Sequence, residues 1–113
     1  MPYQAERFAS FLKKDIAQFL DRSIPRAPGV LCSVTSVVVD PGGERAKIFI
    51  SVFPEQRGEE TFHTLKKYES EARAYISEHL KRRKIPVLTF VRDINQATQV
   101  RLEKLLNNRD DTK

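Results

Sequence analysis

The segment from residue 30 to residue 53 constrains the fold most, because it carries two runs of strand-forming residues around one turn. Residues 30–40 are rich in β-branched side chains. In residues 46–53, aliphatic side chains alternate with a mixed set of polar and aromatic ones, so that Ala46, Ile48, Ile50 and Val52 lie on one side and Lys47, Phe49, Ser51 and Phe53 on the other. Between them, Asp40-Pro41-Gly42-Gly43-Glu44 places Pro and Gly where a type II turn requires them. We therefore expect an antiparallel hairpin. The Val37-Val38-Val39 run is apolar on both faces, which favours a central position for the first strand.

Two other segments have the helical spacing of apolar residues. The first covers residues 5–22 and forms one stripe, made by Phe8, Phe11, Leu12, Ile16, Phe19 and Leu20. Prolines and a glycine within residues 23–29 end this helix. The second covers residues 59–81, and its stripe is interrupted at Glu69-Ser70-Glu71. That pattern permits either a bend or one continuous helix.

The rest of the chain supplies one more strand and one more helix. Val87–Arg92 is predicted as a strand that begins after Pro86, residues 96–106 as a short helix, and residues 107–113 as a disordered tail. The order α-β-β-α(α)-β-α describes an α+β fold, a three-stranded mixed sheet with helices on one face. We expect a single domain over residues 1–106.

Composition agrees with a small soluble domain. The chain has 113 residues, of which 40% are apolar and 31% charged, enough for one core without disulfides. The single cysteine, Cys32, has no partner for an intrachain bridge. No run approaches the roughly 18 apolar residues of a membrane span, and the first residues lack an apolar signal core. We therefore expect a cytoplasmic protein.

The positive charge of the chain is concentrated in one place. Residues 81–92 hold five cations and no acid, whereas the other 15 cations equal the 15 acids, so this stretch accounts for the formal net charge of +5. A localised cationic patch indicates an anionic partner such as nucleic acid. Cations at the end of a helix also complement the helix dipole on a solvated face. The charge pattern alone leaves both interpretations open.

The residues that could perform chemistry are few. Cys32 lies among Val and Leu in a strand, which is typical of a core cysteine and not of a nucleophile. His63 and His79 are 16 residues apart, about 160° around a helix, so they cannot share a metal from one helical face. The glycines match neither a dinucleotide fingerprint nor a phosphate loop. We expect neither an enzyme nor a cofactor or metal.

Two aromatic residues permit another nucleic-acid contact. Phe49 and Phe53 lie on the same side of the second strand as Lys47, a pattern that could stack exposed bases. The same pattern is common where a strand packs against a helix. No sequence feature says which face of the sheet the helices cover.

Several segments together resemble the bacterial ribosome-binding factor A family over nearly the whole chain. The segments are Arg7-Phe8-Ala9 with Lys13-Lys14-Asp15-Ile16; Pro25-Arg26; residues 34–41 followed by residues 46–52; Lys84-Ile85-Pro86-Val87-Leu88-Thr89-Phe90; and Arg101-Leu102. The resemblance implies a type II K-homology-like fold whose glycine clamp is replaced by a helix kink at an Ala-x-Gly element. By alignment the kink glycine corresponds to Ser70, and a glycine usual before the final Arg corresponds to Gln99. Local geometry can therefore differ at both points.

The resemblance also implies a function. Members of the family are non-enzymatic factors that bind the small (30S) ribosomal subunit and its 16S rRNA, assist late maturation and processing, and support cold adaptation. On this basis the RNA-binding residues are expected to be Lys81, Arg82, Arg83, Lys84, Arg7, Lys14, Arg26 and Arg101, with Arg92 structural. We expect a monomer. A general RNA-binding module, or a protein-interaction module that docks through residues 59–80, are the alternatives.

Overall fold

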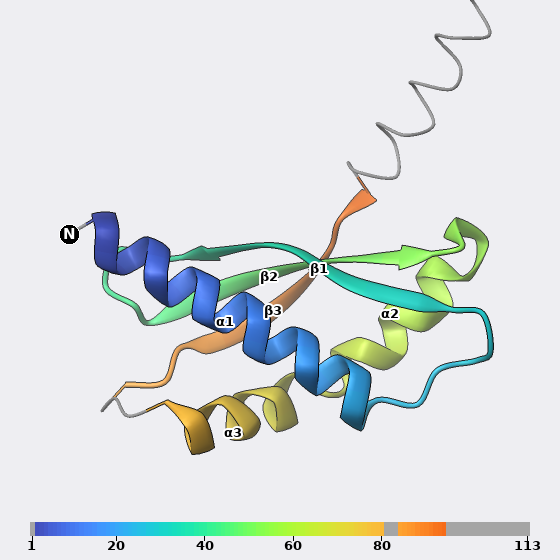
Figure 1. Cartoon of the computed structure of the whole chain (residues 1–113). Helices are drawn as coiled ribbons and strands as arrows, with labels where there is room; N and C mark the ends of the chain where they lie inside the picture. Colours follow the sequence, from blue (N-terminus) through green and yellow to red (C-terminus); the bar gives the residue numbers. More distant parts are fainter. Residues whose placement is uncertain (1, 81–83, 95–113) are drawn as a thin grey trace, which may run out of the picture.

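The computed structural model describes residues 2–80 and 84–94. Its elements are α1 (Pro2–Ser23), β1 (Leu31–Val39), β2 (Arg45–Phe53), the 3-10 helix η1 (Glu55–Arg57), α2 (Gly58–Lys66), α3 (Glu69–His79) and β3 (Val87–Arg92) (Figure 1). This order confirms the predicted one as far as β3. The predicted helix over residues 96–106 and the tail over residues 107–113 lie outside the described residues. The domain boundary at residue 106 therefore stays a prediction.

The three strands form one mixed sheet in the order β1-β2-β3. β1 and β2 are antiparallel, and β3 runs parallel to β2. The mixed sheet is as predicted, but the central position expected for β1 is wrong. β1 is an edge strand, and its ladder to β2 shifts register between Val34 and Ser36. Of the three valines in this run, Val37 and Val39 are half-buried on one side of β1, and Val38 is exposed on the other.

The hairpin turn differs in type from the prediction. The Gly43 N–H donates to the Asp40 carbonyl at 2.8 Å, and the Asp40 N–H donates to the Arg45 carbonyl at 2.9 Å. A type II turn would need positive φ at Gly42, but the positive φ, 74°, is at Gly43. Residues 40–43 therefore form a turn that is not type II, and its last residue, Gly43, has the left-handed backbone conformation. A turn followed by such a glycine is common in hairpins with longer loops. Two successive glycines allow either geometry, so the sequence could not decide between them.

One face of the sheet forms the core. The buried strand residues that point to it are Cys32, Val34, Ala46, Ile48, Ile50, Val52, Leu88 and Phe90. The helices cover them with Leu12, Ile16, Phe19, Leu20, Leu65, Ala72 and Ile76, all buried. Figure 1 shows α1, α2 and α3 on this side of the sheet. The prediction of helices on one face is confirmed, and among the described residues no helix covers the opposite face.

Lys67 and Tyr68 separate α2 from α3. Their N–H groups donate to the Thr64 and Leu65 carbonyls at 3.1 and 2.9 Å, three-residue bonds that end a helix. The possible bend at residues 69–71 is thus a complete break slightly earlier, and the continuous helix is excluded. Ser70 lies in the first turn of α3. The break lets α2 pack on β2 while α3 packs on β3 and α1.

Candidate RNA interface

Lys84 is the described member of the predicted helix-end patch. It precedes β3, and its Nζ lies 3.3 Å from Glu44 Oε2 in the hairpin loop. Both side chains are about two-thirds exposed, at 66% and 67%, so this ion pair is solvated and weak. An incoming phosphate can therefore compete for Lys84 at small cost. Lys81, Arg82 and Arg83 lie outside the described residues.

An open groove of about 350 Å³ adjoins Lys84 in the chain. Its lining is Ser70, Arg73, Ala74, Ser77 and Ile85. Arg73 Nε and Nη2 donate to the carbonyls of Pro86 at 3.1 Å and Ile85 at 2.7 Å, which fixes the guanidinium against the segment before β3. Among the described residues, this lining holds a cation and two hydroxyls but no carboxylate, so it suits an anionic ligand better than a cationic one.

Two further predicted contacts lie on α1. Arg7 and Lys14 are both exposed. They are seven residues apart, so they project from the same side of the helix about 10 Å from each other. Lys14 borders a shallow hollow with Phe11, Asp15 and Gln18. This placement keeps both cations accessible to a large anionic partner.

Arg26 has a different environment from the other predicted contacts. Its side chain is only 21% exposed, and Nη2 lies 3.5 Å from Asp21 Oδ1. It also lies beside Cys32, where burial raises the pKa of the thiol and Arg26 opposes that rise. Cys32 is buried, which confirms it as a core cysteine. Arg26 thus has structural partners, and Arg101 lies outside the described residues.

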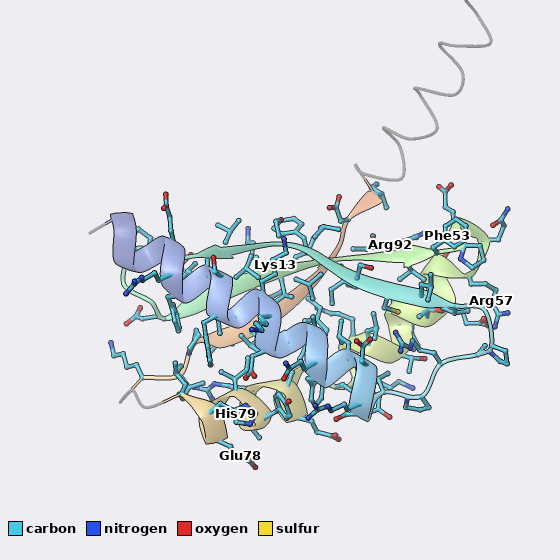
Figure 2. All side chains as sticks on the ribbon, in the orientation of Figure 1. Lys13, Phe53, Arg57, Glu78, His79 and Arg92 are labelled. Carbon is cyan, nitrogen blue, oxygen red and sulfur yellow. The ribbon has the colours of Figure 1, made fainter. Side chains whose placement is uncertain are left out.

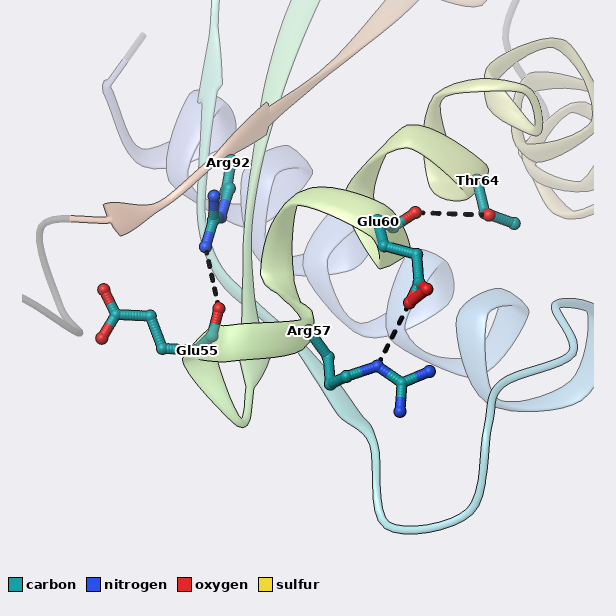
Figure 3. A network of polar contacts seen from close by, with 5 residues as sticks. All are labelled: Glu55, Arg57, Glu60, Thr64 and Arg92. Carbon is teal, nitrogen blue, oxygen red and sulfur yellow. Dashed lines mark hydrogen bonds and ion pairs between the residues drawn. The ribbon is translucent and has the colours of Figure 1, made fainter.

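Arg92 is structural, as expected. Its Nη2 donates to the Glu55 carbonyl at 3.5 Å, and its guanidinium occupies the space where a side chain at residue 58 would begin (Figure 3). Beside it, Arg57 Nε donates to Glu60 Oε1 at 3.1 Å. Arg92 therefore joins the end of β3 to the start of α2.

Sequence reasoning missed the polar contacts between distant elements, and two of them show why. His79, which is labelled on α3 in Figure 2, has its Nδ1 3.0 Å from Oδ2 of the buried Asp15. Its ring stands edge-on to Tyr75. The Phe90 N–H donates to Glu69 Oε2 at 2.6 Å. The paired residues are 64 and 21 positions apart, so no local pattern could reveal them. In residues 2–80 and 84–94, no cluster of three metal-ligating side chains occurs.

Comparison with known proteins decides the family. The family model for ribosome-binding factor A matches residues 4–106. The chain belongs to the ribosome-binding factor A family. Relatives with that name are 34% identical in Synechococcus (95% of this chain, 83% of the relative) and 31% identical in Rippkaea orientalis (96% and 88%). The family is one of binding factors and not of enzymes, as the sequence inventory predicted.

Solved structures of ribosome-binding factor A share the fold. A crystal structure from Thermus thermophilus has a TM-score of 0.66 at 20% identity, covering 78% of this chain and 93% of that one. A solution structure of a Thermotoga maritima protein, described as a putative ribosome-binding factor A, has a TM-score of 0.66 at 22% identity, covering 80% and 88%. These likenesses confirm the predicted K-homology-like fold. Among the described residues, no helix is both long and apolar enough to cross a lipid bilayer.

Proposed function

We propose that this chain is a non-enzymatic assembly factor that binds the small ribosomal subunit through its 16S rRNA and assists late maturation in the cytoplasm. Family membership supports ribosome binding. A Thermus thermophilus ribosome-binding factor A fitted into a cryo-EM map of a 30S complex resembles this chain at 21% identity and a TM-score of 0.65, over 76% of this chain and 91% of that one. The observation that carries the proposal is the groove on α3, whose described lining contains Arg73 and no carboxylate, together with the cationic residues 81–84 that precede Ile85 in the sequence.

The helix-end patch supplies affinity through phosphate contacts. Lys84 exchanges its exposed Glu44 carboxylate for a phosphate, and Lys81, Arg82 and Arg83 extend the same positive segment. Arg7 and Lys14 give a second contact from α1. Such contacts release counterions, so affinity falls steeply with salt while the shape of the fold selects the RNA surface. Arg26, which is held by Asp21, contributes least.

Co-sedimentation with purified small and large subunits across a salt series tests this proposal. The test variant is Arg82→Glu with Lys84→Glu, and the matched control is Arg22→Glu with Lys67→Glu. The control makes the same change in charge at two exposed cations elsewhere, one in the last turn of α1 and one between α2 and α3. The test variant should bind small subunits at least about tenfold more weakly and flatten the salt slope by about two, because two phosphate contacts are lost. The control should retain binding.

Three outcomes would contradict the proposal. Equal binding to both subunits would indicate a general RNA-binding module. Binding that survives salt and the Arg82→Glu, Lys84→Glu change would favour a protein-interaction module that uses α2 and α3. Absence of binding to either subunit would exclude the assembly function.

A further inference from the structure

The sheet face opposite the helices carries exposed apolar side chains. Four of them lie on its strands: Leu31 (63% exposed), Val38 (52%), Phe53 (67%) and Val87 (53%). No described helix covers them, and Phe53 is labelled at the end of β2 in Figure 2. An exposed apolar face of this kind marks a site of interaction.

The central strand places cations and aromatic rings in one row on this face. Its open side consists of Arg45, Lys47, Phe49, Ser51 and Phe53, since alternate strand residues share a face. Phe49 and Phe53 are four residues apart, about 13 Å along the strand, with the small Ser51 between them. Lys47 is exposed and lies opposite Val38 and Thr89 in the neighbouring strands. This face thus has positive charge, from Arg45 and Lys47, at one end of β2 and the exposed aromatic ring of Phe53 at the other.

Negative charge is absent from the strands themselves. None of the residues of β1, β2 or β3 is Asp or Glu. Among the described residues, Asp40, Glu44 and Asp93 adjoin the strand ends. Glu44 pairs with Lys84, and Asp93 accepts a hydrogen bond from Thr35 Oγ1 at 2.5 Å. Between the rings and cations lie hydroxyl side chains, Ser33, Ser36, Ser51 and Thr89. Positive charge, hydroxyls and an exposed ring together are complementary to nucleic acid more than to an apolar protein surface.

We propose that this open sheet face binds single-stranded RNA, with a base stacked on Phe53 and phosphates held by Lys47 and Arg45. Phe49, which is half-buried, contributes the edge of a second stacking surface. Aromatic rings on a sheet can stack any base, so the binding should be largely independent of sequence. This surface is separate from the groove on α3, and the proposal does not depend on ribosomal subunit binding.

The chain contains no tryptophan, which gives a direct test of stacking. Phe53→Trp introduces a single indole at the proposed site, and a decamer of uridine serves as the unstructured RNA probe. Stacking should quench the indole fluorescence saturably and less strongly as salt rises. His63→Trp, on an exposed position of α2, is the control and should show no saturable quenching. Equal quenching at both positions would overturn the proposal.

Substitutions in the otherwise unaltered chain separate the possible occupants. Phe53→Leu keeps the apolar surface but removes the ring, so it should weaken uridine decamer binding at least about fivefold in fluorescence anisotropy. Lys47→Gln should flatten the salt slope by about one, and Lys67→Gln, at an exposed cation between α2 and α3, should leave binding unchanged. Full binding by Phe53→Leu would overturn base stacking and favour an apolar protein partner.

Two other occupants are checked in parallel. Concentration-dependent dimers in sedimentation, lost in Phe53→Leu, would indicate that a second copy covers this face and would overturn the proposal. Uridine binding seen only after residues 95–113 are removed would indicate that the chain's own C-terminal segment covers it. Because none of these measurements uses ribosomal subunits, their failure leaves the subunit-binding result intact, and the two proposals can fail separately.

Discussion

At the residue scale, Gly58 and Arg92 compete for one space. Gly58 is helical, with φ −64° and ψ −48°, so its backbone does not require glycine. A Cβ at this position would instead collide with the guanidinium of Arg92. Glycine is therefore needed here for a close approach and not for its conformational freedom. The guanidinium is the end of a flexible side chain, so the space can be reopened if Arg92 leaves the Glu55 carbonyl.

This competition predicts a coupling between two substitutions. Gly58→Ala should raise the free energy of unfolding by up to about 1 kcal/mol through the higher helix propensity of alanine. Displacement of Arg92 should lower it by a similar amount, so the net change should be small. In the Arg92→Ala background the same substitution should be stabilising. Urea denaturation of the four proteins gives the coupling free energy, expected at about 1 kcal/mol. An identical effect of Gly58→Ala in both backgrounds would show that the two residues do not compete.

At the element scale, side chains from α2 and α3 cover the free edge of β3. The outward N–H of Phe90 donates to Glu69 Oε2 at 2.6 Å, and Lys66 Nζ donates to the Phe90 carbonyl at 3.3 Å and to Glu69 at 2.8 Å. Arg73 holds the carbonyls just before the strand. An edge strand with unpaired backbone groups is a template for aggregation, and here the N–H and the carbonyl of Phe90 both have partners.

Glu69→Ala should therefore destabilise the fold by about 1–3 kcal/mol, because the half-buried Phe90 N–H loses its acceptor. Glu69→Gln should cost less, since the amide oxygen can still accept. Glu71→Ala is the matched control, an exposed acid in the same first turn of α3 with the same interaction with the helix dipole. Hydrogen exchange at the Phe90 amide should accelerate in Glu69→Ala alone. Equal acceleration in both alanine variants would assign the effect to α3 as a whole.

The elements also show what the sequence could predict. Hydrophobic periodicity located β3 at residues 87–92 and most of α1, because those patterns are local. The break at Lys67 and Tyr68 was not located, since Leu65 and Ala72 have a spacing that also fits one continuous helix. The packing of α2 on β2 and of α3 on β3 determines where the helix breaks. The edge position of β1 likewise depends on which strand β3 joins, a long-range pairing that no local pattern contains.

The candidate site was predicted unevenly for similar reasons. Exposure of Arg7, Lys14 and Lys84 followed from charge and periodicity. The partners of Arg26 could not be predicted from charge and periodicity. Asp21 and Cys32 approach Arg26 only when the loop after α1 folds back on β1. The open face of the sheet was undecided in the sequence, since both sides of β2 carry large apolar residues. Only the packed helices show which side remains exposed.

At the scale of the whole molecule, charge is segregated between layers. Residues 54–80, which form η1, α2 and α3, hold six of the 15 acids. The strands hold none. Away from the groove at Arg73, an RNA partner is therefore repelled from the acidic side chains of α2 and α3, and it is attracted to the sheet and to the cationic sequence between α3 and β3. This asymmetry can orient the protein before any specific contact forms.

Phe53 ends β2, whereas Lys84 pairs with Glu44 just before β2 begins. These two residues therefore lie near opposite ends of the strand, and their contributions to small-subunit binding should add. Phe53→Leu removes a neutral ring and should lower affinity without changing the salt slope. Arg82→Glu with Lys84→Glu should change both affinity and slope, because counterion release depends on charged contacts. The combined variant should lose the sum of the separate binding free energies within about 0.5 kcal/mol, as expected for distant sites. The measurement is co-sedimentation of the four proteins with small subunits at several salt concentrations. A change of slope in Phe53→Leu, or a combined loss well above the sum, would mean that both surfaces act on one shared contact.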